Sequence, residues 1–126
     1  MSGAFPAKVV AAGEGKTVML FGVRFGYKVV SGDSGGRLAV LEVEIPPGTL
    51  VKPRGGPHAM WNAGSTPAAV AEILSPAGLE EYFEKLAPIL AAHRPAAEYY
   101  QLAEDYGITI QDDWIEEIER TYGVKL

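Results

Sequence analysis

Residues 53–62 combine residue types that could do chemistry. Prolines at 53 and 57 and a glycine at 55 predict a tight turn, because proline fixes φ and glycine accepts positive φ. His58 follows this turn and begins a predicted short strand over 58–62. Side chains alternate along a strand, so His58, Met60 and Asn62 share one face, and Trp61 lies on the other. An imidazole held in this way could ligate a metal ion or line a cavity.

The residues around His58 give little support for a metal site within one chain. A catalytic metal normally needs about three protein ligands. The sequence holds two histidines and no cysteine, with no His-x-His pair and no carboxylate at an obvious ligand spacing. The other histidine, His93, is interpreted as a solvated residue near a helix C-terminus. No spacing indicates a Ser-His-Asp triad, although triads can be assembled from distant positions.

Two other features could carry chemistry, and both have a simpler interpretation. Glu42 and Glu44 share one face of a predicted strand, which would suit paired carboxylates, but the clean alternation favours a solvated outer face. The glycine-rich segment 31–36 could cradle a phosphate if it opened a helix. It leads instead into a predicted strand, so a hairpin connection is favoured.

The elements that must position these residues are strands first and helices afterwards. Period-two alternation and β-branched residues predict strands over 17–21, 23–30, 37–45 and 68–74, with a further short strand at Val9 and Val10. The strand over 37–45 has the clearest alternation. Ser75 and Pro76 predict the start of a helix that extends to about His93 and is kinked or split at Pro88.

Two more helices are expected near the C-terminus. An apolar stripe on residues 99–106 predicts the first, which Gly107 ends. Asp113 with Glu116 resembles a capping box at the start of the second, which Gly123 ends. We therefore expect residues 1–75 to form a β domain and residues 76–126 to form a helical extension packed on it.

The stretch from 53 to 62 also resembles the second conserved motif of the cupin superfamily. The prolines and glycine of the turn, His58 and Asn62 fit the spacing Pro-x-Gly-x-x-His-x-x-x-Asn. Residues 71–83 look like the last barrel strand and first helix of small bacterial single-domain cupins, and residues 9–47 look like the opening strands. The resemblance implies a mainly β fold, namely a reduced double-stranded β-helix, or jelly roll, followed by C-terminal α-helices.

The chain departs from the cupin pattern between residues 48 and 52. Cupins carry a first motif there, with two histidines and a glutamate that join the second-motif histidine around a metal. Here only three residues separate Gly48 from Lys52, so an internal segment is missing. The resemblance implies a non-catalytic cupin-like protein, structural or binding a small molecule through Phe25, Met60, Trp61 and Asn62. The alternative is a metal-dependent cupin enzyme, such as a dioxygenase or isomerase, that uses His58 with ligands from elsewhere.

Composition limits the other classes of function. The 126 residues are 48% hydrophobic and 21% charged with a net charge of −5, which predicts one globular domain and no nucleic-acid partner. The absence of cysteine, of a signal-like N-terminus and of a long apolar run predicts a cytoplasmic protein without membrane contact. No cofactor is expected, whereas the enzyme alternative implies Fe, Mn, Ni or Zn. Loss of barrel strands should leave open edges, so we expect a homodimer that pairs a strand within 37–45 or 18–30.

Overall fold

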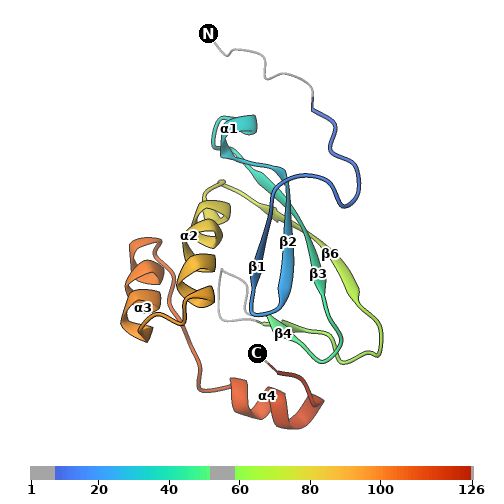
Figure 1. Cartoon of the computed structure of the whole chain (residues 1–126), viewed down its shortest axis with the longest axis vertical. Helices are drawn as coiled ribbons and strands as arrows, with labels where there is room; N and C mark the ends of the chain where they lie inside the picture. Colours follow the sequence, from blue (N-terminus) through green and yellow to red (C-terminus); the bar gives the residue numbers. More distant parts are fainter. Residues whose placement is uncertain (1–7, 52–58, 126) are drawn as a thin grey trace.

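A four-stranded antiparallel sheet forms the centre of the molecule. The computed structural model describes residues 8–51 and 59–125. In the strand order β1-β2-β3-β6, the sheet comprises β1 (Thr17–Leu20), β2 (Val23–Val29), β3 (Ala39–Ile45) and β6 (Ala68–Leu74). The strands lie side by side in Figure 1, with β1 and β6 at the two edges. The sheet is open and does not close into a barrel. The antiparallel strands precede the three longer helices, which confirms the coarse prediction of strands followed by helices.

The alternation of side chains gives the sheet one buried face. Phe25 lies opposite Val43 in β3, and Val43 lies opposite Val70 in β6. Alternate residues of β3, from Ala39 to Ile45, are all buried, as the sequence pattern predicts. Glu44 is exposed on the other face, and Glu42 on that face lies 3.5 Å from the ammonium of Lys28. These two glutamates therefore belong to the outer face of the sheet.

Several predicted strand bounds were wrong in detail. Val9 and Val10 form no strand, and β3 begins at Ala39 rather than at residue 37. The connection from β2 to β3 joins neighbouring antiparallel strands, as a hairpin does, but it contains one helical turn, α1 (Ser31–Ser34). This turn is stabilised locally, because the carboxylate of Asp33 accepts a hydrogen bond of 3.1 Å from the backbone N–H of Val30.

A second, two-stranded sheet lies at the end of the molecule where the chain terminates. It pairs β4 (Leu50–Val51) with β5 (Met60–Trp61). The predicted strand over 58–62 is therefore shorter in the structure, and His58 lies outside the described residues. The C-terminal segment joins this sheet, since the N–H of Leu50 donates to the carbonyl of Lys125 over 2.7 Å. The middle of the chain and its C-terminal segment thus share one small core around Leu50 and Val124.

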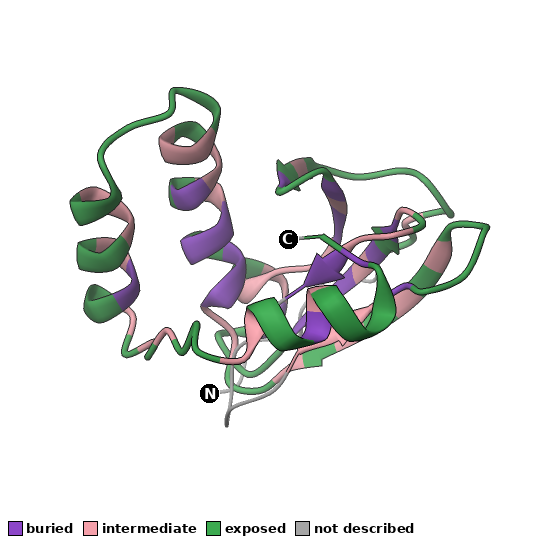
Figure 2. Cartoon of the chain, turned by 90° about the horizontal axis from the view of Figure 1, so that it is seen from below, coloured by how far each residue is buried: buried purple, intermediate pink, exposed green. Residues whose placement is uncertain are grey.

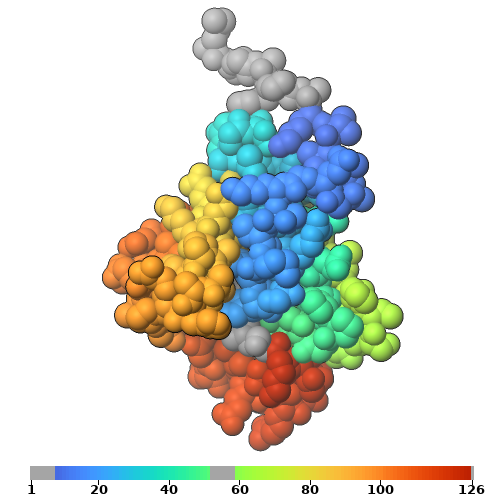
Figure 3. Space-filling view, viewed as in Figure 1, coloured from blue at the N-terminus to red at the C-terminus, as the bar shows by residue number. Residues whose placement is uncertain are grey.

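Three helices complete the fold: α2 (Leu79–Ala91), α3 (Ala96–Asp105) and α4 (Ile115–Tyr122). Helix α2 covers the buried face of the sheet, and α3 lies against α2 on the side away from the sheet (Figure 2). In the space-filling view, α4 and the C-terminus form the lower end of the molecule (Figure 3). The helices and strands occur in comparable amounts, so the fold is mixed rather than mainly β.

The predicted helix starts need correction. Helix α2 begins at Leu79 with Gly78 as its N-cap, because the Ser75 hydroxyl donates to the carbonyl of Arg37 over 3.0 Å instead of capping the helix. Pro88 lies within α2 and does not end it. Helix α4 has Trp114 at its N-cap with no side-chain capping bond, so the predicted capping box at Asp113 does not form.

Of the two ranges expected at the homodimer interface, 37–45 has no free edge in the sheet, whereas 18–30 includes most of β1, which is an edge strand. Strand β3 pairs with β2 on one side and with β6 on the other, so it has no free edge. The same is true of β2, which lies between β1 and β3. Within the described chain, pairing between two copies through the main sheet would have to use the outer edge of β1 or of β6.

Candidate functional site

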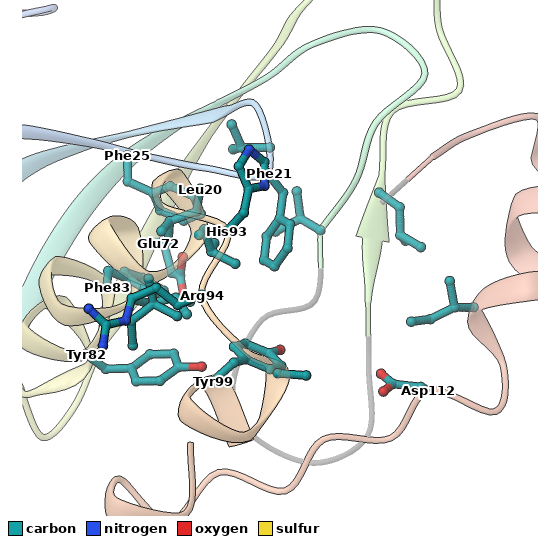
Figure 4. A pocket seen from close by; sticks show the side chains of 18 residues that line it. Leu20, Phe21, Phe25, Glu72, Tyr82, Phe83, His93, Arg94, Tyr99 and Asp112 are labelled. Carbon is teal, nitrogen blue, oxygen red and sulfur yellow. The ribbon is translucent and has the colours of Figure 1, made fainter. Parts of the chain in front are cut away.

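A cavity of about 550 Å³ lies between the buried face of the sheet and the helical half of the chain. The main sheet contributes residues from β1, β2 and β6, and α2 contributes one wall. The remaining lining residues come from the turn after β1, from β4, from α3 and the segment before it, and from the start of α4 and the segment before it. Figure 4 shows side chains from these elements pointing toward the same space. The lining is mostly aromatic and aliphatic, which is typical of a small-molecule site.

The buried wall of the cavity is formed by apolar side chains of β2 and α2. Phe25 comes from the buried face of β2, and Phe83 and Leu86 come from the face of α2 that packs on the sheet. The rings of Phe25 and Phe83 have centroids 4.8 Å apart and are inclined by 46°. Aromatic pairs at such distances are favourable beyond the area that they bury. This wall is therefore part of the hydrophobic core.

Two lining residues have a backbone conformation that side chains disfavour. Phe21, in the two-residue connection between β1 and β2, has φ of 51°, and His93, after α2, has φ of 48°. Within residues 8–51 and 59–125 these are the two non-glycine residues with positive φ. Both line the cavity, and Figure 4 draws them at the same end of it. The prediction that His93 is solvated near a helix C-terminus is confirmed, but the sequence did not indicate that His93 lines a cavity.

The cavity also contains a small number of polar groups. Glu72 lies on the β6 face that continues the buried side of the sheet, opposite Leu41. Arg94 is held by Glu98 in the first turn of α3, with its Nε 2.6 Å from a carboxylate oxygen. Asp112 accepts a hydrogen bond from the hydroxyl of Tyr100 over 3.4 Å. The charged groups of Arg94 and Asp112 are thus engaged by protein partners.

The tyrosines of the cavity stay neutral. Burial raises the pKa of the Tyr82 phenol. Burial, reinforced by the nearby Tyr82 and Asp112, raises the pKa of Tyr99 well above its ordinary value. Because a free phenol already titrates near 10, both hydroxyls are protonated at neutral pH. They can offer hydrogen bonds to a ligand, and neither can serve as a general base near neutral pH.

The predicted site residues are distributed over different parts of the structure. Phe25 lines the cavity, whereas Met60, Trp61 and Asn62 are not among the described residues that line it. Met60 packs against the main core from a partly buried position. The ring of Trp61 contacts Tyr122 of α4, with centroids 4.7 Å apart.

Asn62 stabilises the turn after β5. Its side-chain amide donates to the carbonyls of Ile45, over 3.0 Å, and Thr66, over 2.8 Å. Its side-chain oxygen accepts from the N–H of Gly64 over 2.9 Å. Asn62 is buried, so these bonds satisfy the amide that burial would otherwise penalise. Asn62 therefore holds the turn together, and its role in ligand binding stays a prediction.

Nothing in the described residues groups three potential metal ligands. No cluster of three or more histidine and acidic side chains occurs in residues 8–51 and 59–125. His58 lies outside that part of the chain, so its role as a metal ligand remains a prediction. The described helices also include none with both the length and the apolar content required to cross a bilayer.

Phe21, Glu72, Tyr99 and His93 were missed as site residues by the sequence analysis. The turn at Phe21-Gly22 carried a usable signal, because an aromatic residue is unusual at the first position of a two-residue hairpin connection. The others come together only through the fold. Comparison with protein-family models, with curated proteins and with solved structures finds no match. The resemblance to cupins therefore remains a prediction that rests on the residues quoted for it.

Proposed function

We propose that this protein binds a small, uncharged and largely apolar molecule in the cavity between the sheet and α2, without catalysing a reaction. The observation that carries the proposal is the cavity itself, because about 550 Å³ lies within the range of roughly 300–1,000 Å³ that small-molecule sites occupy. Phe25, Phe83 and Leu86 offer it an apolar wall that already exists without a ligand.

The polar groups support an uncharged ligand. An anion would meet the carboxylates of Glu72 and Asp112, and Arg94, the one guanidinium among the described lining residues, is already engaged by Glu98. A cation would have to leave water for walls that are mostly apolar, and the two lining carboxylates of Glu72 and Asp112 already have partners within the protein. The neutral hydroxyls of Tyr82 and Tyr99 suit a ligand with a hydroxyl or carbonyl group.

The relation to a double-stranded β-helix belongs to the same proposal. We infer that the sheet is the remaining half of a cupin-like barrel and that α2 occupies the place of the missing strands. The order of the elements supports this inference, since antiparallel strands precede the helices and the buried sheet face forms one wall of the cavity. No observation on the described residues specifically supports the metal-dependent enzyme alternative.

A fluorescence titration with N-phenyl-1-naphthylamine, an uncharged apolar dye, tests the binding proposal. The dye should bind saturably at about one molecule per chain. Ile89→Trp places a larger side chain at a partly buried lining position of α2 and should weaken binding about tenfold or more by filling the cavity. Ile73→Trp is the matched control, because Ile73 is 71% exposed on the outer sheet face and should leave binding unchanged.

Two results would overturn the proposal. One is the absence of saturable dye binding to the unaltered protein. The other is equal binding by the Ile89→Trp and Ile73→Trp proteins when circular dichroism shows that both are folded, because the dye would then occupy some other surface.

A further inference from the structure

We propose that Phe21 and His93 form an aromatic clamp at the mouth of the cavity, and that this clamp selects flat, unsaturated ligands. The proposal rests on the proposed binding function, and it adds the class of ligand and the residues that recognise it. Three independent features lead to it: the backbone at Phe21, the backbone at His93, and the convergence of both side chains on one cavity.

Phe21 occupies a turn position whose positive φ favours Asn, Asp or Gly. Leu20 pairs with Val23, so Phe21 and Gly22 form a two-residue hairpin connection, with φ of 51° and 77°. Positive φ at both positions is the signature of a type I′ turn, which prefers Asn or Asp followed by Gly. A bulky side chain in this conformation is unfavourable, by about 5- to 30-fold in the folding equilibrium.

His93 occupies a position that is usually glycine. The N–H of Arg94 donates to the carbonyl of Ile89 and the N–H of His93 donates to the carbonyl of Leu90, each over 3.1 Å. This pair of bonds defines a Schellman motif, in which the residue with positive φ sits just after the helix. His93 takes that position with φ of 48°, so it carries the same kind of cost as Phe21.

Packing in the core does not explain why these side chains are present. Phe21 is 45% exposed, and His93 is also exposed. Both nevertheless line the same cavity, and they reach it from segments far apart in the sequence (Figure 4). Residues with strained backbone conformations are common at ligand clamps. There the contacts that the side chain makes with a ligand offset the conformational cost that glycine would avoid.

The chemistry of the two rings indicates the ligand. Phenyl and imidazole rings present flat π faces, and such faces interact best with other rings by offset stacking or edge-to-face contact. A saturated ligand of the same size fills the cavity equally well but gains no such contact with the two rings of the clamp. The clamp should therefore discriminate by unsaturation rather than by volume.

The test uses the double variant Phe21→Asn with His93→Gly, which gives each position a residue suited to positive φ. Displacement of N-phenyl-1-naphthylamine is measured with 2-naphthol and with decahydro-2-naphthol, which share one carbon skeleton and are uncharged at neutral pH. The unaltered protein should prefer 2-naphthol by about tenfold, as expected for two aromatic contacts. The double variant should lose this preference, and its unfolding temperature should rise by about 3 °C or more.

The outcomes separate the clamp from the cavity. Lost preference together with a raised unfolding temperature supports the clamp, and the conservative variant Phe21→Tyr should keep the preference. If the double variant keeps the tenfold preference, or if it unfolds at a lower temperature, the clamp is wrong while the cavity stands. If the unaltered protein binds no dye, both the proposed function and the clamp are wrong.

Discussion

Replacing Glu80 by alanine should lower the free energy of unfolding by about 2–3 kcal/mol at neutral pH. Glu80 lies in the first turn of α2 and is 2% exposed, which is unusual for a carboxylate. One carboxylate oxygen accepts from the N–H of Ser31 over 2.8 Å and also from its hydroxyl, and the other accepts from the N–H of Gly78 over 2.7 Å. The side chain thereby joins the start of α2 to the segment after β2.

The magnitude follows from the groups that would lose their partner. Alanine leaves the two N–H groups of Ser31 and Gly78 without their acceptor, and each unsatisfied buried donor costs about 1–3 kcal/mol. Both residues are only partly buried, so water can replace some of the loss, and the lower half of that range applies. The Ser31 hydroxyl can rotate toward another acceptor and adds little. Two donors at slightly more than 1 kcal/mol each give the expected total.

The effect should depend on pH with a defined sign. Burial by itself would raise the pKa of Glu80, but the hydrogen bonds donated by Ser31 and Gly78 hold it below the ordinary value. A carboxylate whose pKa is lowered by folding stabilises the protein above the pKa of the unfolded chain, about 4.3. That stabilisation is lost as the pH falls through the folded pKa. The difference between the two proteins should therefore shrink in acid.

Urea unfolding followed by tryptophan fluorescence measures this difference at pH 7 and at a series of pH values below 4.5. Glu81→Ala is the matched control, because the neighbouring Glu81 is exposed and should change stability by less than about 0.5 kcal/mol. The reasoning is refuted if Glu80→Ala costs no more than Glu81→Ala, or if its cost is the same at every pH.

Three further predictions concern the motif region and assembly. Asn62→Ala should destabilise the protein by about 2–3 kcal/mol in the same unfolding assay, because three hydrogen bonds of a buried amide are lost, and an effect under about 0.5 kcal/mol would contradict the structure. Purified protein should contain no stoichiometric Fe, Mn, Ni or Zn; elemental analysis showing about one metal per chain, lost in His58→Ala, would overturn this and revive the enzyme alternative. The protein should sediment as a homodimer at tens of micromolar, paired through the edge of β1 or β6, and a stable monomer there would exclude it.

Much of the local structure was predictable because its causes are local. The alternation of β3 follows from the period of two between faces of a strand, so its four buried side chains can be read directly from the sequence. The helical stripes of α2 and α3 follow in the same way from a period of 3.6. The glycine that ends α4 also acts locally, since Gly123 adopts the positive φ of a helix C-cap.

The sequence did not reveal the distant hydrogen-bond partners of two side chains. Ser75 is a good N-cap by type, but its hydroxyl donates to Arg37 on another part of the chain, and α2 starts four residues later than Ser75. Asn62 matched a ligand-binding motif, but its amide is used by the turn that follows β5 and by Ile45. In both cases the side chain found a hydrogen-bond partner that no sequence window contains.

The sequence by itself determined the four strands of the main sheet, the three longer helices and the side chains of β3 that face the core, because hydrophobic periodicity and turn residues act over a few positions. Only the tertiary structure decided that α2 rather than a second sheet covers the buried face, and that β3 lies inside the sheet. It alone brought Phe21 and His93, which lie far apart in the chain, to one cavity. The physical reason is that a binding site is a set of contacts between distant residues, and the chain's local preferences do not specify those contacts.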